Sequence, residues 1–169
     1  MTLTLHRISK WKYVTQSTLQ EHGFGAARYG GRWNSADPEM EHDRRILYAS
    51  DTLALAMLEV VVHVDSDVLR TVKHGHVTLA VEPDAIVDLD LKALPVSWNA
   101  HPPSAETQVI GDEWFDTRSS PVLRLPSAIL PLTVYGSGHA NYLINAFHPD
   151  IAQAVSLLGA QPLPFDPRL

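Results

Sequence analysis

One carboxylate, Glu59, lies inside a run of apolar residues, and it is the first place to expect chemistry. The run covers residues 53–62 and reads Leu-Ala-Leu-Ala-Met-Leu before Glu59 and Val-Val-Val after it. Burying an unpaired ionised carboxylate in such surroundings costs several kcal/mol. The chain must therefore pair Glu59, neutralise it, or place it at the edge of a cleft where it acts on a ligand. Glu59 also has a plainer interpretation, because His63 follows it at the i+4 spacing of a helix surface pair.

A second candidate is the turn that contains Arg32. Two glycines precede this arginine, so the backbone can run close to a ligand, and a guanidinium offers a planar fork of donors that suits phosphate or carboxylate. The adjacent Trp33 offers a stacking face. An ordinary glycine turn with an ion-paired arginine explains the same residues.

Tyr48 and Ser127 are weaker candidates. Tyr48 lies at the end of the strand expected before the Glu59 helix, so its ring can point into a cleft that the helix borders. Ser127 stands between two expected strands, without a local base that would make it a nucleophile. Packing is the more usual role of a tyrosine in such a position, and most such serines cap turns.

Composition excludes several classes of function. The chain has no cysteine, and its nine histidines form no recognised ligand motif, so we expect neither a disulfide nor a metal site. The formal net charge of -6, without a Lys/Arg-rich stretch, argues against nucleic acid as a partner. No apolar run reaches about 18 residues, so we expect no membrane span and a cytoplasmic protein.

The pattern of short elements predicts an α+β fold in one domain, residues 1–169. Helices are expected over residues 53–62, where Ser50, Asp51 and Thr52 provide N-cap candidates, and over residues 150–158. Residues 23–34 and 94–104 are expected to be loops. Expected strands are residues 3–8, 45–49, 77–81, 86–91, 122–125, 129–134 and 142–144. Strands and helices do not alternate regularly, which disfavours a doubly wound sheet.

Many short motifs follow one another along nearly the whole chain. They are His6-Arg7-Ile8, Gly31-Arg32-Trp33-Asn34, Leu47-Tyr48-Ala49-Ser50, Ala56-Met57-Leu58-Glu59-Val60, Gly111-Asp112-Glu113-Trp114, Leu123-Arg124-Leu125-Pro126-Ser127-Ala128, Asn141-Tyr142-Leu143-Ile144-Asn145, His148-Pro149-Asp150 and Phe165-Asp166-Pro167-Arg168-Leu169. In this order the motifs resemble the RES-domain family, the toxins of RES-Xre toxin–antitoxin pairs.

The resemblance implies a fold like that of ADP-ribosyltransferases, with short mixed or antiparallel sheets flanked by helices, and a toxin that degrades NAD. Cleavage of the nicotinamide–ribose bond would transfer ADP-ribose to water, phosphate or a protein. The resemblance assigns the catalytic set to Arg32, Tyr48, Glu59 and Ser127. The expected contacts to NAD are Arg7, Arg32, Trp33, Tyr48 and Asn141, with Trp33 taken from the stacking argument above.

The chemistry of that reaction agrees with these residue types. Loss of nicotinamide passes through an oxocarbenium-like ribose, which a carboxylate such as Glu59 stabilises, while Tyr48 stacks on the nicotinamide and Arg32 holds phosphates. No metal is required. A toxin of this kind also implies an Xre-type helical antitoxin as partner. The alternatives are a protein ADP-ribosyltransferase, a silent nucleotide-binding module, which gains nothing from Glu59, and a ribonuclease, which the acidic charge disfavours.

Overall fold

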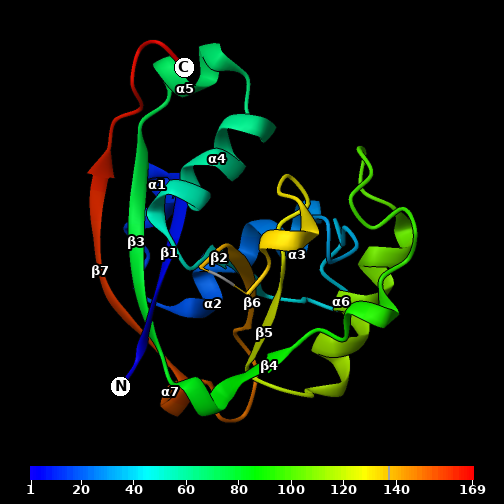
Figure 1. The fold of residues 1–169 in the computed structure, drawn as a ribbon. Coiled ribbons are helices and arrows are strands. Elements are labelled where there is room, and N and C mark those ends of the chain that lie inside the picture. The colour runs from blue at the N-terminus through cyan, green and yellow to red at the C-terminus, as the bar shows by residue number, and fades with distance from the viewer. Residues whose placement is uncertain (137) are drawn as a thin grey trace.

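The computed structural model describes residues 1–136 and 138–169, in which seven strands form one mixed sheet. The strand order is β4-β5-β6-β2-β1-β3-β7, with β4 and β5 parallel and the other neighbours antiparallel. The strands are β1 (Leu3–Lys10), β2 (Ile46–Ser50), β3 (His74–Val81), β4 (Ile86–Asp88), β5 (Val122–Pro126), β6 (Ala140–Asn145) and β7 (Val155–Leu163). Figure 1 shows β1, β3 and β7 on one side of the molecule and β4, β5, β6 and β2 on the other.

The sheet is nearly divided where β1 meets β2. These two strands pair at one position, His6 opposite Ser50, whereas β1 pairs with β3 along its whole length. The two halves are held together by a shared core instead. Leu5 and Leu79 from one half and Leu47 and Ile144 from the other belong to the same buried cluster and are fully buried.

A second core covers the opposite face of the β2-β5-β6 half. In β6, Leu143 packs with Ile46, Trp33 and Trp114 in this second core, while its neighbours in sequence face the first core. Side chains alternate between faces along a strand, so a strand buried on both faces reads as a continuous apolar run. This burial explains why the central strands were predictable as short apolar segments.

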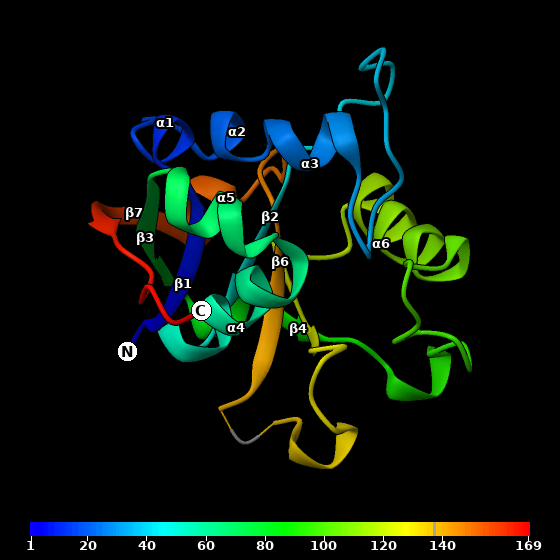
Figure 2. The same ribbon diagram turned by 90° about the horizontal axis from the view of Figure 1, so that it is seen from above.

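Seven helices flank the sheet in the described chain. They are α1 (Trp11–Val14), α2 (Leu19–His22), α3 (Phe24–Tyr29), α4 (Leu53–His63), α5 (Ser66–Thr71), α6 (Ala105–Thr117) and α7 (Ile151–Ala154). In Figure 2, α1, α2 and α3 follow one another along one side of the molecule, and α6 lies beyond α3. Helix α4 packs on β1 and β2. Its N-cap is Thr52, whose hydroxyl accepts a hydrogen bond from the backbone N–H of Leu55 at 3.2 Å. Within the described residues, no helix is both long and apolar enough to cross a membrane.

Three expectations are wrong. The loop expected over residues 23–34 contains α3, and Gly23 at its start has a helical backbone conformation and lies against the Arg45 backbone, so this glycine serves a close contact and not a turn. Residues 129–134 form a turn and a short 3-10 helix, Leu132–Val134, instead of a strand. Pro131 lies inside this segment, and a proline lacks the N–H that a central strand needs. Residues 150–158 were expected to be a helix, but the helix ends at Ala154 and β7 follows at once, paired with β3. Pairing between strands distant in sequence overrides the local helix preference there.

The three N-terminal helices and α6 were not predicted. Helix α6 carries Gly111, which weakens a helical pattern. In the fold this glycine lies against the backbone of Trp33, where a Cβ atom would overlap the Trp33 carbonyl oxygen. The contact explains why a residue without a side chain occupies the middle of the longest helix in the described chain.

We predict that Gly111→Ala destabilises the protein although alanine favours helices. The overlap with Trp33 should lower the free energy of unfolding by about 1–3 kcal/mol, as overpacking does. The matched control is Gly25→Ala in α3, where an added Cβ meets no atom within 4 Å. That change should leave stability equal or raise it by up to about 1 kcal/mol. Urea denaturation compares the two variants, and equal effects would contradict the assigned contact.

From the contact between the imidazoles of His6 and His76, we predict that the protein loses stability in mild acid. Their Nδ1 and Nε2 atoms lie 2.9 Å apart, so one ring donates and the other must stay unprotonated to accept. Burial lowers the pKa of both rings; Asp51 partly opposes this at His6, and His6 adds to it at His76. The unfolded chain therefore binds protons first, at about pH 6.5, and stability falls as the pH drops through that value.

We expect the melting temperature to be lower at pH 5.5 than at pH 7.5. A His76→Gln variant keeps a polar side chain at this position but takes up no proton, so its melting temperature should fall less over the same interval. An equal fall in both proteins would show that this pair does not carry the pH dependence.

Candidate active site

Glu59 has two hydrogen-bond donors on the same oxygen atom, and both come from near the ends of inner strands of the sheet. The Oε1 atom of Glu59 accepts a bond from the Ser127 hydroxyl at 2.7 Å and another from the Asn141 side-chain amide at 2.6 Å. The three residues come from α4, from the segment directly after β5 and from β6. The Glu59 carboxylate is thus paired with hydrogen-bond donors, which is the first of the three outcomes expected from the sequence.

Strand register brings these side chains together. Asn141 lies opposite Ser50 in β2 and opposite Leu125 in β5, so the last residues of β2 and β5 meet the beginning of β6. Helix α4 begins three residues after Ser50 and packs over this end of β2. Antiparallel pairing therefore determines which polar residues face the Glu59 carboxylate.

The Glu59 side chain is 24% exposed, so its carboxylate lies at the surface of the site and not inside the core. Its other oxygen, Oε2, is 3.9 Å from the Nδ1 atom of His63. That Nδ1 lies closer to the Glu59 backbone carbonyl oxygen, at 2.7 Å. The predicted pair at i+4 is present, and its hydrogen bond goes to the main chain.

Tyr48 uses its hydroxyl to hold the turn that carries Arg32. The hydroxyl donates to the Asn34 side-chain oxygen at 2.6 Å and accepts from the backbone N–H of Trp33 at 3.1 Å. Burial raises the pKa of this phenol, so the hydroxyl stays protonated as a donor. Gly31 is required here, because a Cβ atom on it would lie 2.6 Å from the Tyr48 oxygen.

Arg32 reaches across to the 94–104 segment. Its Nη1 atom donates to the backbone oxygens of Trp98 and Ala100, both at 2.9 Å. Partial burial lowers the pKa of Arg32, and the Glu59 carboxylate opposes that shift. Arg32 is therefore close enough to Glu59 for their charges to interact, and it anchors a loop with one of its nitrogens.

Two predicted contacts for NAD have structural partners instead. Arg7 donates to the backbone oxygens of Tyr48 at 3.0 Å and His22 at 3.1 Å, which ties β1 to β2 and α2. Burial lowers the Arg7 pKa to about 10, and its Nε is a buried donor without a partner in the described chain. Trp33 is 2% exposed and belongs to the second core, so its ring offers no open face for stacking.

Sequence reasoning missed one polar residue of this site, Ser50. It is 4% exposed, and its hydroxyl donates to the Asn141 side-chain oxygen at 2.7 Å. The sequence identifies Ser50 as a helix-cap candidate and as the last residue of the motif Leu47-Tyr48-Ala49-Ser50, without a role in the site. Its position at the end of a strand whose neighbour is Asn141 follows from the register, which a single sequence does not reveal.

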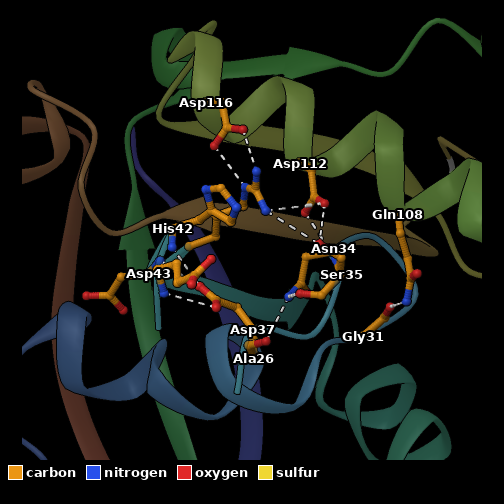
Figure 3. Close-up of polar contacts among 12 residues, drawn as sticks. Ala26, Gly31, Asn34, Ser35, Asp37, His42, Asp43, Gln108, Asp112 and Asp116 are labelled. Atoms are coloured by element: carbon orange, nitrogen blue, oxygen red, sulfur yellow. Dashed lines mark hydrogen bonds and ion pairs between the residues drawn. The ribbon is translucent and has the colours of Figure 1, made fainter. Parts of the chain in front are cut away.

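A separate polar network lies on α6, away from Glu59. Figure 3 shows Asp112 and Asp116 facing the segment that carries Ser35 and Asp37. Arg44 joins the two sides, with bonds of 2.8 and 2.7 Å to the Asp116 carboxylate. This segment lines a hollow of about 480 Å³ that includes none of the predicted site residues. Among the described residues, no three His, Asp or Glu side chains are grouped closely enough to hold a metal ion.

Comparison with known proteins shows which proteins this chain is similar to. The family model described as "RES domain" matches residues 4–166. A protein named "Toxin Res" from Photorhabdus laumondii subsp. laumondii is 33% identical over 167 residues, covering 99% of this chain and 97% of that protein. A "Prs ADP-ribosylating toxin" from Sphingobium sp. is 31% identical over 168 residues, covering 95% of this chain and 96% of that protein.

A solved structure has the same fold. One chain of the crystal structure of the M. tuberculosis MbcT-MbcA toxin-antitoxin complex matches with a TM-score of 0.68, covering 96% of this chain and 85% of that chain. At 17% sequence identity the likeness concerns the fold alone. It confirms the predicted α+β class.

We predict that Tyr48→Phe weakens the fold, because two partners of its hydroxyl lose their hydrogen bond. The free energy of unfolding should fall by about 1–3 kcal/mol, the cost of leaving buried polar groups unpaired. The control is Tyr29→Phe, since the Tyr29 side chain is 73% exposed; its effect should stay within about 0.5 kcal/mol. Equal urea midpoints for Tyr48→Phe and the wild type would contradict a structural role for the hydroxyl.

Proposed function

Since this chain belongs to the RES domain family, we propose that it is the toxin of a toxin–antitoxin pair and that it degrades NAD by breaking the nicotinamide–ribose bond. The observation that carries the proposal is the partly exposed Glu59 carboxylate, whose Oε1 accepts hydrogen bonds from Ser127 and Asn141. Glu59, Ser127 and Asn141 form a cluster of polar side chains in which the Glu59 carboxylate is held by two hydrogen bonds.

The proposed role of Glu59 is to stabilise the positive charge that develops on the ribose as nicotinamide leaves. Two donors on Oε1 fix the carboxylate before the substrate arrives, and preorganised charge of this kind costs no reorganisation during the reaction. Oε2 is then the oxygen that faces the ribose. The reaction needs this side chain as an anion, since the charge that develops on the ribose is positive.

Arg32 and Tyr48 are proposed to border the NAD site. Arg32 uses Nη1 for the loop oxygens of Trp98 and Ala100, which leaves its other guanidinium nitrogens for a phosphate. Tyr48 is committed through its hydroxyl to the turn around Trp33, so its proposed part is to present the ring at the wall of the site. The hydrogen bonds of Arg7 are made within the chain, so its proposed contribution to the binding of anionic NAD is through its positive charge.

Water or phosphate is the proposed acceptor of ADP-ribose, and a protein acceptor is the second candidate. One observation favours the second candidate: the relative from Sphingobium sp. bears the name "Prs ADP-ribosylating toxin". The same charge stabilisation by Glu59 serves either acceptor. A silent binding module is disfavoured, because a carboxylate beside an anionic ligand costs affinity.

The proposal extends to the partner and to the cell. A chain of a toxin-antitoxin complex shares this fold, and an enzyme that consumes NAD must be restrained in its own host. We therefore expect a cognate antitoxin of the helical Xre type, an active toxin in the cytoplasm where NAD is available, and residues 1–169 acting as one domain. No metal takes part in the proposed chemistry.

We predict that Glu59→Gln lowers the rate of nicotinamide release from NAD by about a hundredfold or more, because the charge that stabilises the transition state is lost. Glutamine retains an oxygen that accepts bonds from Ser127 and Asn141, so the melting temperature should stay near that of the wild type. The control is Glu113→Gln, since Glu113 is exposed on α6; its rate should be unchanged.

The products identify the acceptor. Mass spectrometry should find ADP-ribose for hydrolysis, and ADP-ribose 1''-phosphate only when phosphate is added for phosphorolysis. A mass increase on an added protein, with no free ADP-ribose, would favour protein ADP-ribosylation. Unchanged NAD consumption by Glu59→Gln would refute the role of Glu59.

A further inference from the structure

The geometry points to Ser50 as a positioning residue that holds the Asn141 amide in place while its Nδ2 donates to the Glu59 carboxylate. Ser50 touches neither Glu59 nor the proposed reacting atoms and acts through Asn141. The catalytic consequence of this inference rests on the proposed function. The structural consequence, a fixed amide, is independent of it.

One chain of hydrogen bonds links Ser50, Asn141 and Glu59. An ionised carboxylate accepts hydrogen bonds and donates none, so Asn141 must present its amide nitrogen to Glu59, as it does at 2.6 Å. Its amide oxygen then points the other way, at the Ser50 hydroxyl 2.7 Å distant. The Ser50 hydroxyl has one hydrogen and uses it on that oxygen. The carboxylate thus decides which amide atom faces it, and the Ser50 hydroxyl, bonded to the other amide atom, holds the amide in place.

Ser50 is well placed to act in this manner, because its own position is fixed. Its Cα is paired with His6 on one side and with Asn141 on the other, at the point where the two halves of the sheet join. Its side chain is buried. A buried hydroxyl on a paired strand has few alternative partners, so its hydrogen bond to Asn141 is persistent.

Removal of the hydroxyl has a definite consequence. In Ser50→Ala the Asn141 oxygen loses its donor, and the amide is held at one end only. The Glu59 carboxylate still requires Nδ2 as its partner, so that bond remains, but its angle is no longer fixed. Glu59 then keeps Ser127 as its one firmly positioned donor. The expected defect lies in the chemical step and not in the binding of NAD.

Two measurements on the full-length protein test the inference. In ¹⁵N NMR spectra, the side-chain amide signals of Asn141 should shift and exchange faster with solvent in Ser50→Ala than in the wild type. In NAD cleavage assays, kcat should fall about tenfold with KM nearly unchanged, as for the loss of one oriented hydrogen bond. The control is Ser120→Ala, because Ser120 is equally buried, at 4%, and bonds to Trp114 and Val122 instead.

A double-mutant cycle separates a positioning role from a general loss of structure. Ser50→Ala should have no further effect on kcat when Asn141 is already alanine. In a Ser120→Ala background it should still lower kcat about tenfold, because Ser120 shares no hydrogen-bond partner with Ser50. Should Ser50→Ala fail to fold, Ser50→Cys, with its weaker donor, gives the same comparison.

The outcomes distinguish this inference from the proposed function. If the wild type releases no nicotinamide from NAD, the proposed function fails, and the Asn141 amide signals alone decide the role of Ser50. If NAD is cleaved but the amide signals and kcat of Ser50→Ala match those of the wild type, the role of Ser50 is overturned and the function stands. A Ser120→Ala variant with the same shift of the Asn141 signals would also overturn it.

Discussion

The hydrogen bonds to one carboxylate oxygen, Oε1 of Glu59, are the interactions on which the site depends. A charge inside an apolar helix segment is tolerated only where donors replace water. Ser127 and Asn141 supply those donors. Asn141 lies near the beginning of β6, and Ser127 directly follows the end of β5, which pairs with that part of β6. The register of β2, β5 and β6 is therefore as important to the site as the identity of its residues.

The same sheet explains why several residues that suggested ligand contacts also serve the fold. The β1–β2 junction consists of one paired position, and Arg7 reinforces it by bonding to the Tyr48 backbone. Tyr48 in turn holds the turn before Asn34, and that turn carries Arg32. Arg7 and Tyr48 thus hold parts of the fold together through these hydrogen bonds. The proposed contacts to NAD use atoms that do not take part in these bonds.

The sequence predicted the α+β class, the strands at the centre of the sheet and the helix that carries Glu59, because apolar alternation and N-capping by Thr52 are local signals. The family resemblance was confirmed by the match of a RES domain model to residues 4–166. Local reasoning failed where distant contacts decide: β7 forms by pairing with β3, and Gly111 in α6 makes sense only beside Trp33. Ser50 was missed for the same reason, since its function in the site depends on which residue lies opposite it.

The most direct test of the account is a crystal structure of the Glu59→Gln variant with NAD, which this variant should bind without cleaving. The account predicts the nicotinamide-bearing ribose against the residue 59 side chain, with Ser127 and Asn141 still bonded to that side chain and a phosphate near Arg32. NAD bound away from residue 59, for example in the hollow beside Asp112, would contradict it.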